Sequence, residues 1–332
     1  MHWLPLIWIG IIGFGIIMYL ILDGFTLGTG MMMPFLSTHE RNLAMSAILP
    51  TWDGNQTWLV LGAATLYGAF PIAFSTILPI LYLPLILMVI ALLFRGVVFE
   101  FRLKSTKGVK HWDMAFIIAS LTVTFIQGLI LGNTVEGFPL MPNVTVPPDN
   151  NFLTPFSLFT AISLVFGYSL LGSTRLILKT EGALQQKMYR VAKVCAIALA
   201  IAMIVVSLWT PLLRDNIAAR WFDPRYQYYL AILPTITGGL FYGLFYLLFR
   251  HRGEASPYWL SVALFVCAYI GFIISIFPYI VPYHITIFQA AAPDNTLKFL
   301  LVGGVIMLPL LLIYTGYSYH IFKGKVKDVI HY

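Results

Sequence analysis

Two carboxylates lie inside or beside apolar stretches of this sequence, where an acidic side chain is costly to keep. Asp23 lies deep in the first apolar stretch, and Asp53 lies at the start of the second. A carboxylate in hydrocarbon costs at least about 2.5 kcal/mol, so it is retained where it faces a partner, water or the interior of a bundle. A carboxyl group held away from bulk water can exchange protons near neutral pH. Both residues are therefore candidates for a proton path.

Each carboxylate also has a structural alternative. Asp53 could cap a helix, because Thr51, Asp53 and Asn55 all suit a helix N-terminus. Asp23 has apolar residues on both sides, so its alternative is a buried hydrogen bond and not a cap. The residue types leave the functional and the structural interpretations open.

Arg95 and Glu100 lie at the end of the third apolar stretch. The simplest interpretation is an arginine that reaches the membrane surface and forms a salt bridge there. The alternative is that one of the two pairs with Asp23 or Asp53 and tunes its protonation. Beside Asp23, Gly24 and Gly28 form a GxxxG pair, which predicts close packing between helix backbones.

The elements that must position these residues are membrane-spanning helices. Hydrophobic residues make up 59% of the 332 residues and charged residues only 10%, whereas a soluble domain averages about 25% charged. The apolar residues form long stretches close to the ~20 residues that a helix needs to cross a bilayer. We therefore predict an all-α polytopic membrane protein. Its nine transmembrane helices are expected at about 4–36, 48–70, 75–100, 113–132, 155–177, 191–213, 227–249, 258–282 and 296–322.

The basic residues predict the orientation of these helices. With the N-terminus outside, all Lys and Arg residues fall in inner segments except four, which are Arg214, Arg220, Arg225 and Lys298. Lys and Arg concentrate on the cytoplasmic side of membrane proteins. The net charge of +7 is then explained by topology, and no nucleic-acid partner is expected. The C-terminus is expected in the cytoplasm.

We expect one integral membrane domain (1–332) built from two four-helix bundles, 1–132 and 155–282, and a ninth helix, 296–322. The third span ends in LLFRG (92–96) and the seventh in LLFRHRG (247–253), which indicates either an internal repeat or a chance similarity. The first stretch is too long for one perpendicular crossing, so it is expected to tilt, bend or leave the membrane near Gly30.

The chain shows no evident catalytic, cofactor-binding or metal-binding residue. A membrane haem protein usually places axial His or Met residues in mid-helix. The seven histidines lie in loops, at termini or at span ends; they are His2, His39, His111, His251, His284, His320 and His331. Cys195 and Cys267 lie in apolar stretches and are expected to be inert buried thiols.

Three segments resemble one family. LDGFTLGTGMMMPF (22–35), TWDGNQTWLV (51–60) and FRGVVFEFR (94–102) are similar, in order and spacing, to motifs of cytochrome bd-type quinol oxidase subunit II. They cover the first third of the chain. In the second motif Gln56 stands where many members have Glu, which removes one potential acid.

The resemblance implies a partner and a reaction. The family's complex oxidises quinol at the outer face of a bacterial cell membrane and reduces dioxygen to water with cytoplasmic protons. Two b haems and one d haem belong to subunit I, and this chain would be the haem-free subunit II beside it, in contact with membrane lipids. The resemblance also allows for a small accessory subunit. A proton path in the family passes the acid that matches Asp53, and Asp23 is the matching acid of the first motif.

Two other functions fit intramembrane acids, namely an ion-coupled secondary transporter and an assembly scaffold with no proton role. A transporter places its substrate near the midplane, often at broken helices in both halves. The first stretch has glycines for such a break at Gly28 and Gly30. The fifth stretch has Gly167 and Gly172 but no acid.

Overall fold

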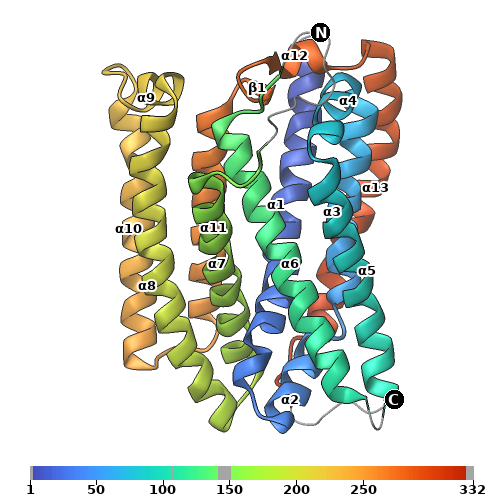
Figure 1. The fold of residues 1–332 in the computed structure, drawn as a ribbon, viewed down its shortest axis with the longest axis vertical. Helices are drawn as coiled ribbons and strands as arrows, with labels where there is room; N and C mark the ends of the chain where they lie inside the picture. The colour runs from blue at the N-terminus through green and yellow to red at the C-terminus, as the bar shows by residue number, and fades with distance from the viewer. Residues whose placement is uncertain (1–2, 106–107, 141–150, 327–332) are drawn as a thin grey trace.

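Long helices that run along a common axis make up the computed structural model, which describes residues 3–105, 108–140 and 151–326 (Figure 1). Within these residues, eight helices are long and apolar enough to cross a membrane. They are α1 (Trp3–Met32), α5 (Tyr82–Lys104), α6 (Val109–Glu136), α7 (Pro155–Lys179), α8 (Gly182–Leu213), α10 (Gln227–Arg250), α11 (Ser256–Ile276) and α13 (Asp294–Ile321). The all-α polytopic fold is therefore as predicted.

A ninth crossing is formed only if a bent helix pair is counted as one span. α3 (Trp52–Ala69) and α4 (Pro71–Ile80) meet at an angle of 120°. Proline lacks a backbone N–H and clashes with the preceding turn, and Pro71 begins α4 directly after the non-helical Phe70. The predicted third span, 75–100, was wrong at its start, because residues 75–80 belong to α4 and α5 begins at Tyr82.

The first span does not break at its glycines. α1 continues past Gly30 to Met32 and is followed by one 3₁₀ turn, η1 (Met33–Phe35), which contains Pro34. The helical span therefore runs without a break from Trp3 to Phe35, and the expected departure near Gly30 was wrong. The glycines of α1 serve helix packing instead, as described below.

A short helix, α2 (Thr38–Ile48), connects η1 to α3 and was not predicted. Its N-cap Ser37 and Glu40 form a reciprocal capping box, in which each side chain accepts a hydrogen bond from the other residue's backbone N–H. The Ser-x-x-Glu spacing is a sequence signal for a helix start. Glu40 also forms a 2.9 Å salt bridge with Lys187 of α8, which ties α2 to that helix.

Several short elements lie at the end of the molecule away from α2 (Figure 1). These are α9 (Asp215–Trp221), β1 (Tyr279–Val281), β2 (Ile285–Thr286) and α12 (Ile287–Ala290), with β1 and β2 paired antiparallel. The predicted eighth span, 258–282, was too long. α11 ends at Ile276, two residues before Pro278, and the chain then enters β1.

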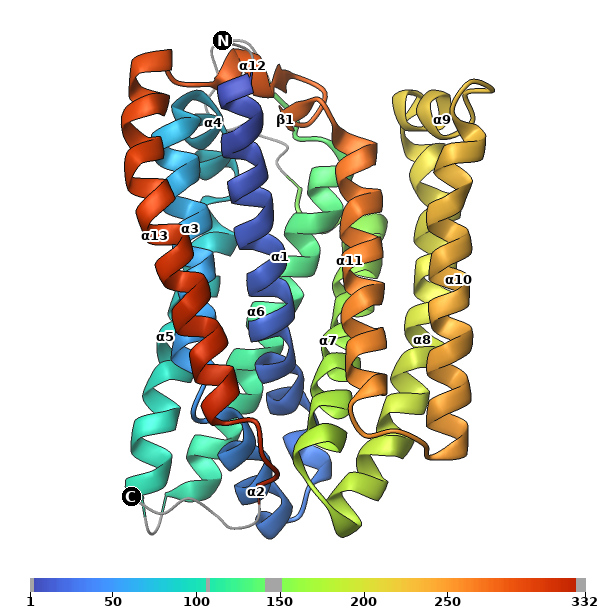
Figure 2. The ribbon, with the colours of Figure 1, turned by 180° about the vertical axis from the view of Figure 1, so that it is seen from behind.

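α1 lies at the centre of the helix packing. It contacts α3, α6, α7, α11 and α13, and Figure 2 shows it between α13 and α11. α5 packs on α6, α6 on α7 and α7 on α8, while α10 packs on α11. The main hydrophobic core draws side chains from α1, α5, α6, α7 and α11 together, so the first four spans and the next four share it.

The basic residues gather at the α2 end of the molecule. The alternating helix directions place the ends of α5, α7, α10 and α13 there, together with the Lys and Arg residues that follow them. Lys107 and Lys327 lie outside the described residues. The four exceptions named above belong to the opposite end.

Candidate functional site

Asp23 of α1 and Arg95 of α5 form a fully buried ion pair. The Asp23 Oδ2 atom lies 2.9 Å from the Arg95 Nη1 atom, and both side chains have 0% of their surface exposed. Each charge is therefore balanced by the other where water cannot reach it. Of the two residues at the end of the third stretch, Arg95 is the one that meets a predicted acid.

Hydrogen bonding does not complete this ion pair. Both carboxylate oxygens of Asp23 and all three guanidinium nitrogens of Arg95 are without a hydrogen-bond partner among the described residues. The 2.9 Å contact is thus a close ion pair whose angles are unfavourable for a hydrogen bond. Buried polar atoms are normally bonded, so this centre holds unused capacity for donating and accepting hydrogen bonds.

A short series of polar side chains extends from the ion pair on α1 to α6 and α7. Tyr19 lies one helical turn before Asp23 on α1 and is close enough to interact with it. Gln127 of α6 donates a 2.8 Å hydrogen bond to the Tyr19 hydroxyl and accepts one of 2.6 Å from the hydroxyl of Tyr168 on α7. The two buried tyrosines and one glutamine therefore link α1, α6 and α7 around Asp23.

Glycines bring α1 and α7 into contact beside this chain. A Cβ atom added at Gly24 would lie 2.8 Å from the ring of Tyr168, and one added at Gly28 would overlap the Tyr168 carbonyl oxygen. Gly172 faces Gly28 from α7. Only glycine allows this backbone approach, so the pair that sequence analysis assigned to packing lies at a helix crossing.

Asp53 does not join the buried ion pair. It lies in the first turn of α3 and is exposed, and its side chain forms no hydrogen bond or salt bridge with the described residues. It faces outward with Val60 and Tyr67, which are 64% and 65% exposed. The three residues are seven positions apart and so share one face of the helix. The structure therefore separates the two predicted acids into a buried one and a surface one.

Asn55, which the sequence suggested only as a capping residue, makes the inward contacts of the second motif. Its amide donates a 2.7 Å hydrogen bond to the Leu22 carbonyl of α1 and accepts one of 2.9 Å from the Tyr319 hydroxyl of α13. It is buried. The motif thus joins α3 to α1 and α13 immediately before Asp23.

Glu100 pairs with neither acid. Its side chain is 68% exposed and lies 3.6 Å from Lys104, one turn along α5. Arg102 instead forms a buried cluster that sequence analysis missed, in which Asp113 of α6 accepts hydrogen bonds of 2.5 Å from Arg102 and 3.1 Å from Arg41. The sequence contained two signals for this cluster, the arginine that ends FEFR, Arg102, and the acidic residue near the start of α6, Asp113.

The described histidines all lie at the surface of this chain. They are His39, His111, His251, His284 and His320. His2 and His331 lie outside the described residues. In the described part of the chain, no three His, Cys, Asp or Glu side chains are grouped so that they could hold a metal ion.

The fold and these side chains define a class: a polytopic, all-helical membrane protein whose polar centre is a charge-compensated ion pair between two spans. The sequence profile described as "Cytochrome bd terminal oxidase subunit II" matches residues 4–322. The chain belongs to this family, and it is a subunit of an oxidoreductase.

Individual proteins support this assignment at low sequence identity. The chain is 24% identical over 371 residues to cytochrome bd-I ubiquinol oxidase subunit 2 of Escherichia coli K12, covering 97% of this chain and 95% of that protein. It is 25% identical over 319 residues to cytochrome bd ubiquinol oxidase subunit 2 of Bacillus subtilis, covering 93% and 92%. The bd oxidase structure from Geobacillus thermodenitrificans matches with a TM-score of 0.79 at 18% identity, over 96% of this chain and 98% of that one.

Proposed function

We propose that this chain is the haem-free subunit II of a quinol oxidase in a bacterial cell membrane. In the complex, a haem-bearing subunit I would take electrons from quinol and reduce dioxygen to water, with protons drawn from the cytoplasm. The observation that carries the proposal is the family match over residues 4–322. The exposed histidines support placing the two b haems and the d haem in the partner.

The outer face of α3 and α5 suits contact with that partner. Val60 and Tyr67 on α3 and Leu93 and Phe94 on α5 are all more than half exposed. Such an apolar surface suits lipid or another membrane protein equally well. Asp53 on the same face distinguishes the two, because a carboxylate toward lipid is costly and one in an interface can meet polar groups. We infer that subunit I covers this side.

Asp53 then stands where protons could enter the complex. It lies in the first turn of α3, which follows α2 of the basic end, and that end is expected to face the cytoplasm with the C-terminus. Its carboxylate has no partner in the described chain, so it is available to water and to groups of subunit I. We assign Asp53 to the entrance of a proton path that follows the subunit interface.

Asp23 and Arg95 would serve the same function differently. Their mutual compensation fixes α1 against α5 immediately behind the second motif. The pair's unused hydrogen-bonding atoms could order water near the path. We assign to Arg95 the role of holding Asp23 in place, with Glu100 remaining at the surface beside Lys104.

Purification through a tag on this chain tests the proposal. A gentle detergent extract should yield a second, larger polypeptide, and its reduced-minus-oxidised spectrum should show haem b and haem d bands. The complex should consume oxygen when a quinol is added. A colourless preparation that contains this chain alone would contradict the assignment to subunit II.

A further inference from the structure

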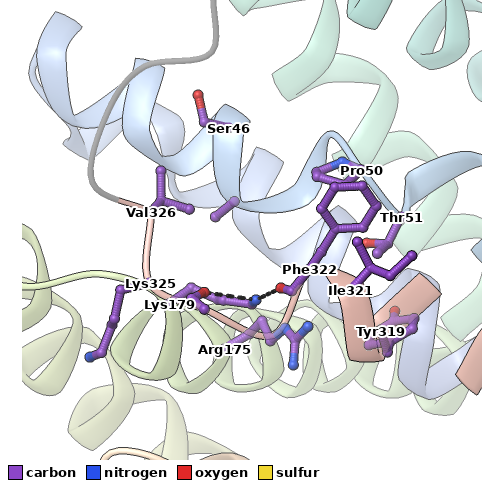
Figure 3. A pocket seen from close by; sticks show the side chains of 12 residues that line it. Ser46, Pro50, Thr51, Arg175, Lys179, Tyr319, Ile321, Phe322, Lys325 and Val326 are labelled. Carbon is purple, nitrogen blue, oxygen red and sulfur yellow. Dashed lines mark hydrogen bonds between the residues drawn. The ribbon is translucent and has the colours of Figure 1, made fainter. Parts of the chain in front are cut away.

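A basic cavity opens at the α2 end of the molecule, and neither Asp23 nor Arg95 is among its described lining residues. It has a volume of about 410 Å³ and lies between α2, α7, the end of α13 and the segment 322–326, here called the C-terminal strap (Figure 3). Arg175, Lys179 and Lys325 line it, together with Thr51 and Tyr319. Neither Asp nor Glu occurs among the described residues that line the cavity.

Arg175 is the buried cation of this cavity. Its guanidinium carbon lies 5.0, 5.1 and 5.2 Å from the ring centres of Phe25, Tyr258 and Tyr319, and the residue is only 7% exposed. The three rings hold the guanidinium by cation–π contact. They do not satisfy its N–H donors, and its Nε is buried without a hydrogen-bond partner among the described residues.

The two lysines are used differently. Lys179 donates hydrogen bonds to the carbonyl oxygens of Phe322 and Gly324 and so pins the strap, but these neutral acceptors leave its charge uncompensated. Lys325 forms a 2.9 Å salt bridge with Glu254, outside the cavity. Two buried positive charges, those of Arg175 and Lys179, therefore remain without a carboxylate in the described chain.

The C-terminal end of α7 explains part of this arrangement. Partial negative charge at a helix C-terminus favours cations, and both Arg175 and Lys179 lie in the last two turns of α7. A helix terminus provides no acceptor for the buried Nε of Arg175, however. An anion with several oxygens would provide one and would balance the remaining charge.

We propose that the cavity between α2, α7 and the C-terminal strap binds a phosphate group, with Arg175 as its main ligand. The planar guanidinium matches phosphate oxygens with two parallel N–H donors. Basic pockets between membrane helices suit the headgroups of anionic lipids. The phosphate could belong to such a lipid or be free in the aqueous phase, and the same protein groups would bind either.

Two measurements on the purified complex with its partner subunit distinguish these sources. Native mass spectrometry of complex extracted from phosphatidylglycerol nanodiscs counts the phospholipid molecules that remain bound. Equilibrium dialysis of delipidated complex against labelled inorganic phosphate detects a saturable aqueous site. A retained lipid that inorganic phosphate does not displace identifies a headgroup site, and saturable phosphate binding without lipid retention identifies a free-anion site.

Variants assign the binding to this cavity. Arg175→Gln should reduce retention or affinity by about tenfold or more, because a charge-assisted bidentate contact is lost. Arg175→Lys keeps the positive charge but lacks the planar guanidinium. Its phosphate or lipid binding should therefore be weaker than that of the wild type and stronger than that of Arg175→Gln. Arg250→Gln is the matched control, since Arg250 is an exposed arginine at the end of α10, and it should bind as the wild type does.

Two outcomes would overturn the proposal. The first is wild-type complex that retains no lipid and binds no phosphate saturably. The second is equal binding by Arg175→Gln and Arg250→Gln. Arg175→Gln could fail to assemble, which its haem spectrum would reveal. The test then compares Arg175→Lys with the wild type, and equal binding by these two would overturn the proposal.

Discussion

Asp23 and Arg95 compensate each other in a region where neither side chain reaches solvent. Replacing Asp23 by Asn leaves a buried guanidinium without its counter-charge. Removing one partner of a buried ion pair typically costs about 3–5 kcal/mol. We expect Asp23→Asn to lower the yield of assembled complex and its thermal midpoint, with a milder effect on turnover per haem, as measured by thermal unfolding and oxygen consumption.

The control for this prediction removes both charges. Asp23→Leu combined with Arg95→Met should recover much of the thermal midpoint, because an apolar pair needs no compensation. An unchanged thermal midpoint and full haem content in Asp23→Asn would mean that the ion pair is dispensable.

Asp53 differs because it is exposed in this chain and makes no contact that a substitution would break. Asp53→Asn should leave haem content and thermal midpoint unchanged. It should lower oxygen turnover by roughly tenfold or more, the scale on which a positioned proton-transfer group contributes. Asp53→Glu keeps a carboxyl group and should retain most of the turnover. Normal turnover in Asp53→Asn would remove this residue from the proton path.

At the residue scale, the sequence could predict which acids were unusual but not which way they face. The cost of a buried charge identifies Asp23 from its apolar surroundings alone. The direction of a side chain depends on the rotation of its helix against its neighbours, which is why Arg95 and Glu100 could not be distinguished as partners. LLFR occurs in both α5 and α10, yet Arg95 is buried in a pair and Arg250 is exposed.

At the scale of the elements, the crossing of α1 and α7 leaves little room for a larger side chain. Gly28→Ala places a Cβ atom on the carbonyl oxygen of Tyr168, and overpacking of this kind costs about 1–3 kcal/mol. We expect a lower thermal midpoint and less assembled complex. Gly10→Ala, on the same helix with nothing within 4 Å of the new Cβ, should be neutral in both measurements. Equal stability of the two variants would show that the helices can separate without loss.

The C-terminal strap should respond to acid. Hydrogen bonds from Lys325 and from Gln185 hold the pKa of Glu254 below its ordinary value of 4.5. A carboxyl whose pKa is lowered by folding stabilises the folded form above its unfolded-state pKa, and this contribution disappears as the pH falls through the lowered value. The salt bridge from Glu254 to the strap is therefore present at neutral pH and is lost as the pH falls through the lowered pKa of Glu254. Because the Glu254 side chain is 52% exposed, the effect should be small.

A spin label on Gly324→Cys measures this response, since Cys195 and Cys267 are both buried. The label should become more mobile as the pH is lowered from about 6 to about 3.5. Glu254→Gln should be mobile throughout and show no pH dependence. A label that is equally immobile at both pH values in the wild type would show that the other contacts of the strap hold it without Glu254, among them the hydrogen bond from Lys325 to the Thr180 carbonyl oxygen.

Hydropathy located the long helices well because each must bury about the same length in the bilayer. The predicted starts of α7 and α10 coincide with the observed ones. Two errors arise where apolar residues continue through a proline, at α4 and α5 and after α11, because hydropathy does not register the loss of a backbone N–H. The predicted sixth span, 191–213, starts too late, because α8 begins at Gly182 with polar turns that hydropathy does not assign to a span. α2 was missed because it is too polar for a span, although its capping box was present in the sequence.

For the whole molecule, we expect the partner to contact one side of the helix assembly and not the other. α3 and α5 lie on one side and α8 and α10 on the other (Figures 1 and 2). A photo-crosslinking amino acid at Val60 should form an adduct with subunit I, because Val60 shares its face with Asp53. The same group at Leu208 of α8, which is 68% exposed, should form none. An adduct from Leu208 alone would place subunit I on the opposite side.

The hydrogen bonds that α13 forms with α1 and α3 constrain the order in which the fold can be completed during synthesis. The Trp8 indole near the start of the chain donates a hydrogen bond to the carbonyl oxygen of Leu297, 289 residues later, and Asn55 accepts one from Tyr319. A ribosome that feeds the membrane from the N-terminus delivers Trp8 first and its partner nearly last. The first helix is therefore complete before the residue that accepts this hydrogen bond exists. The bonds from Trp8 to Leu297 and from Tyr319 to Asn55 can form only after the last helix has been synthesised.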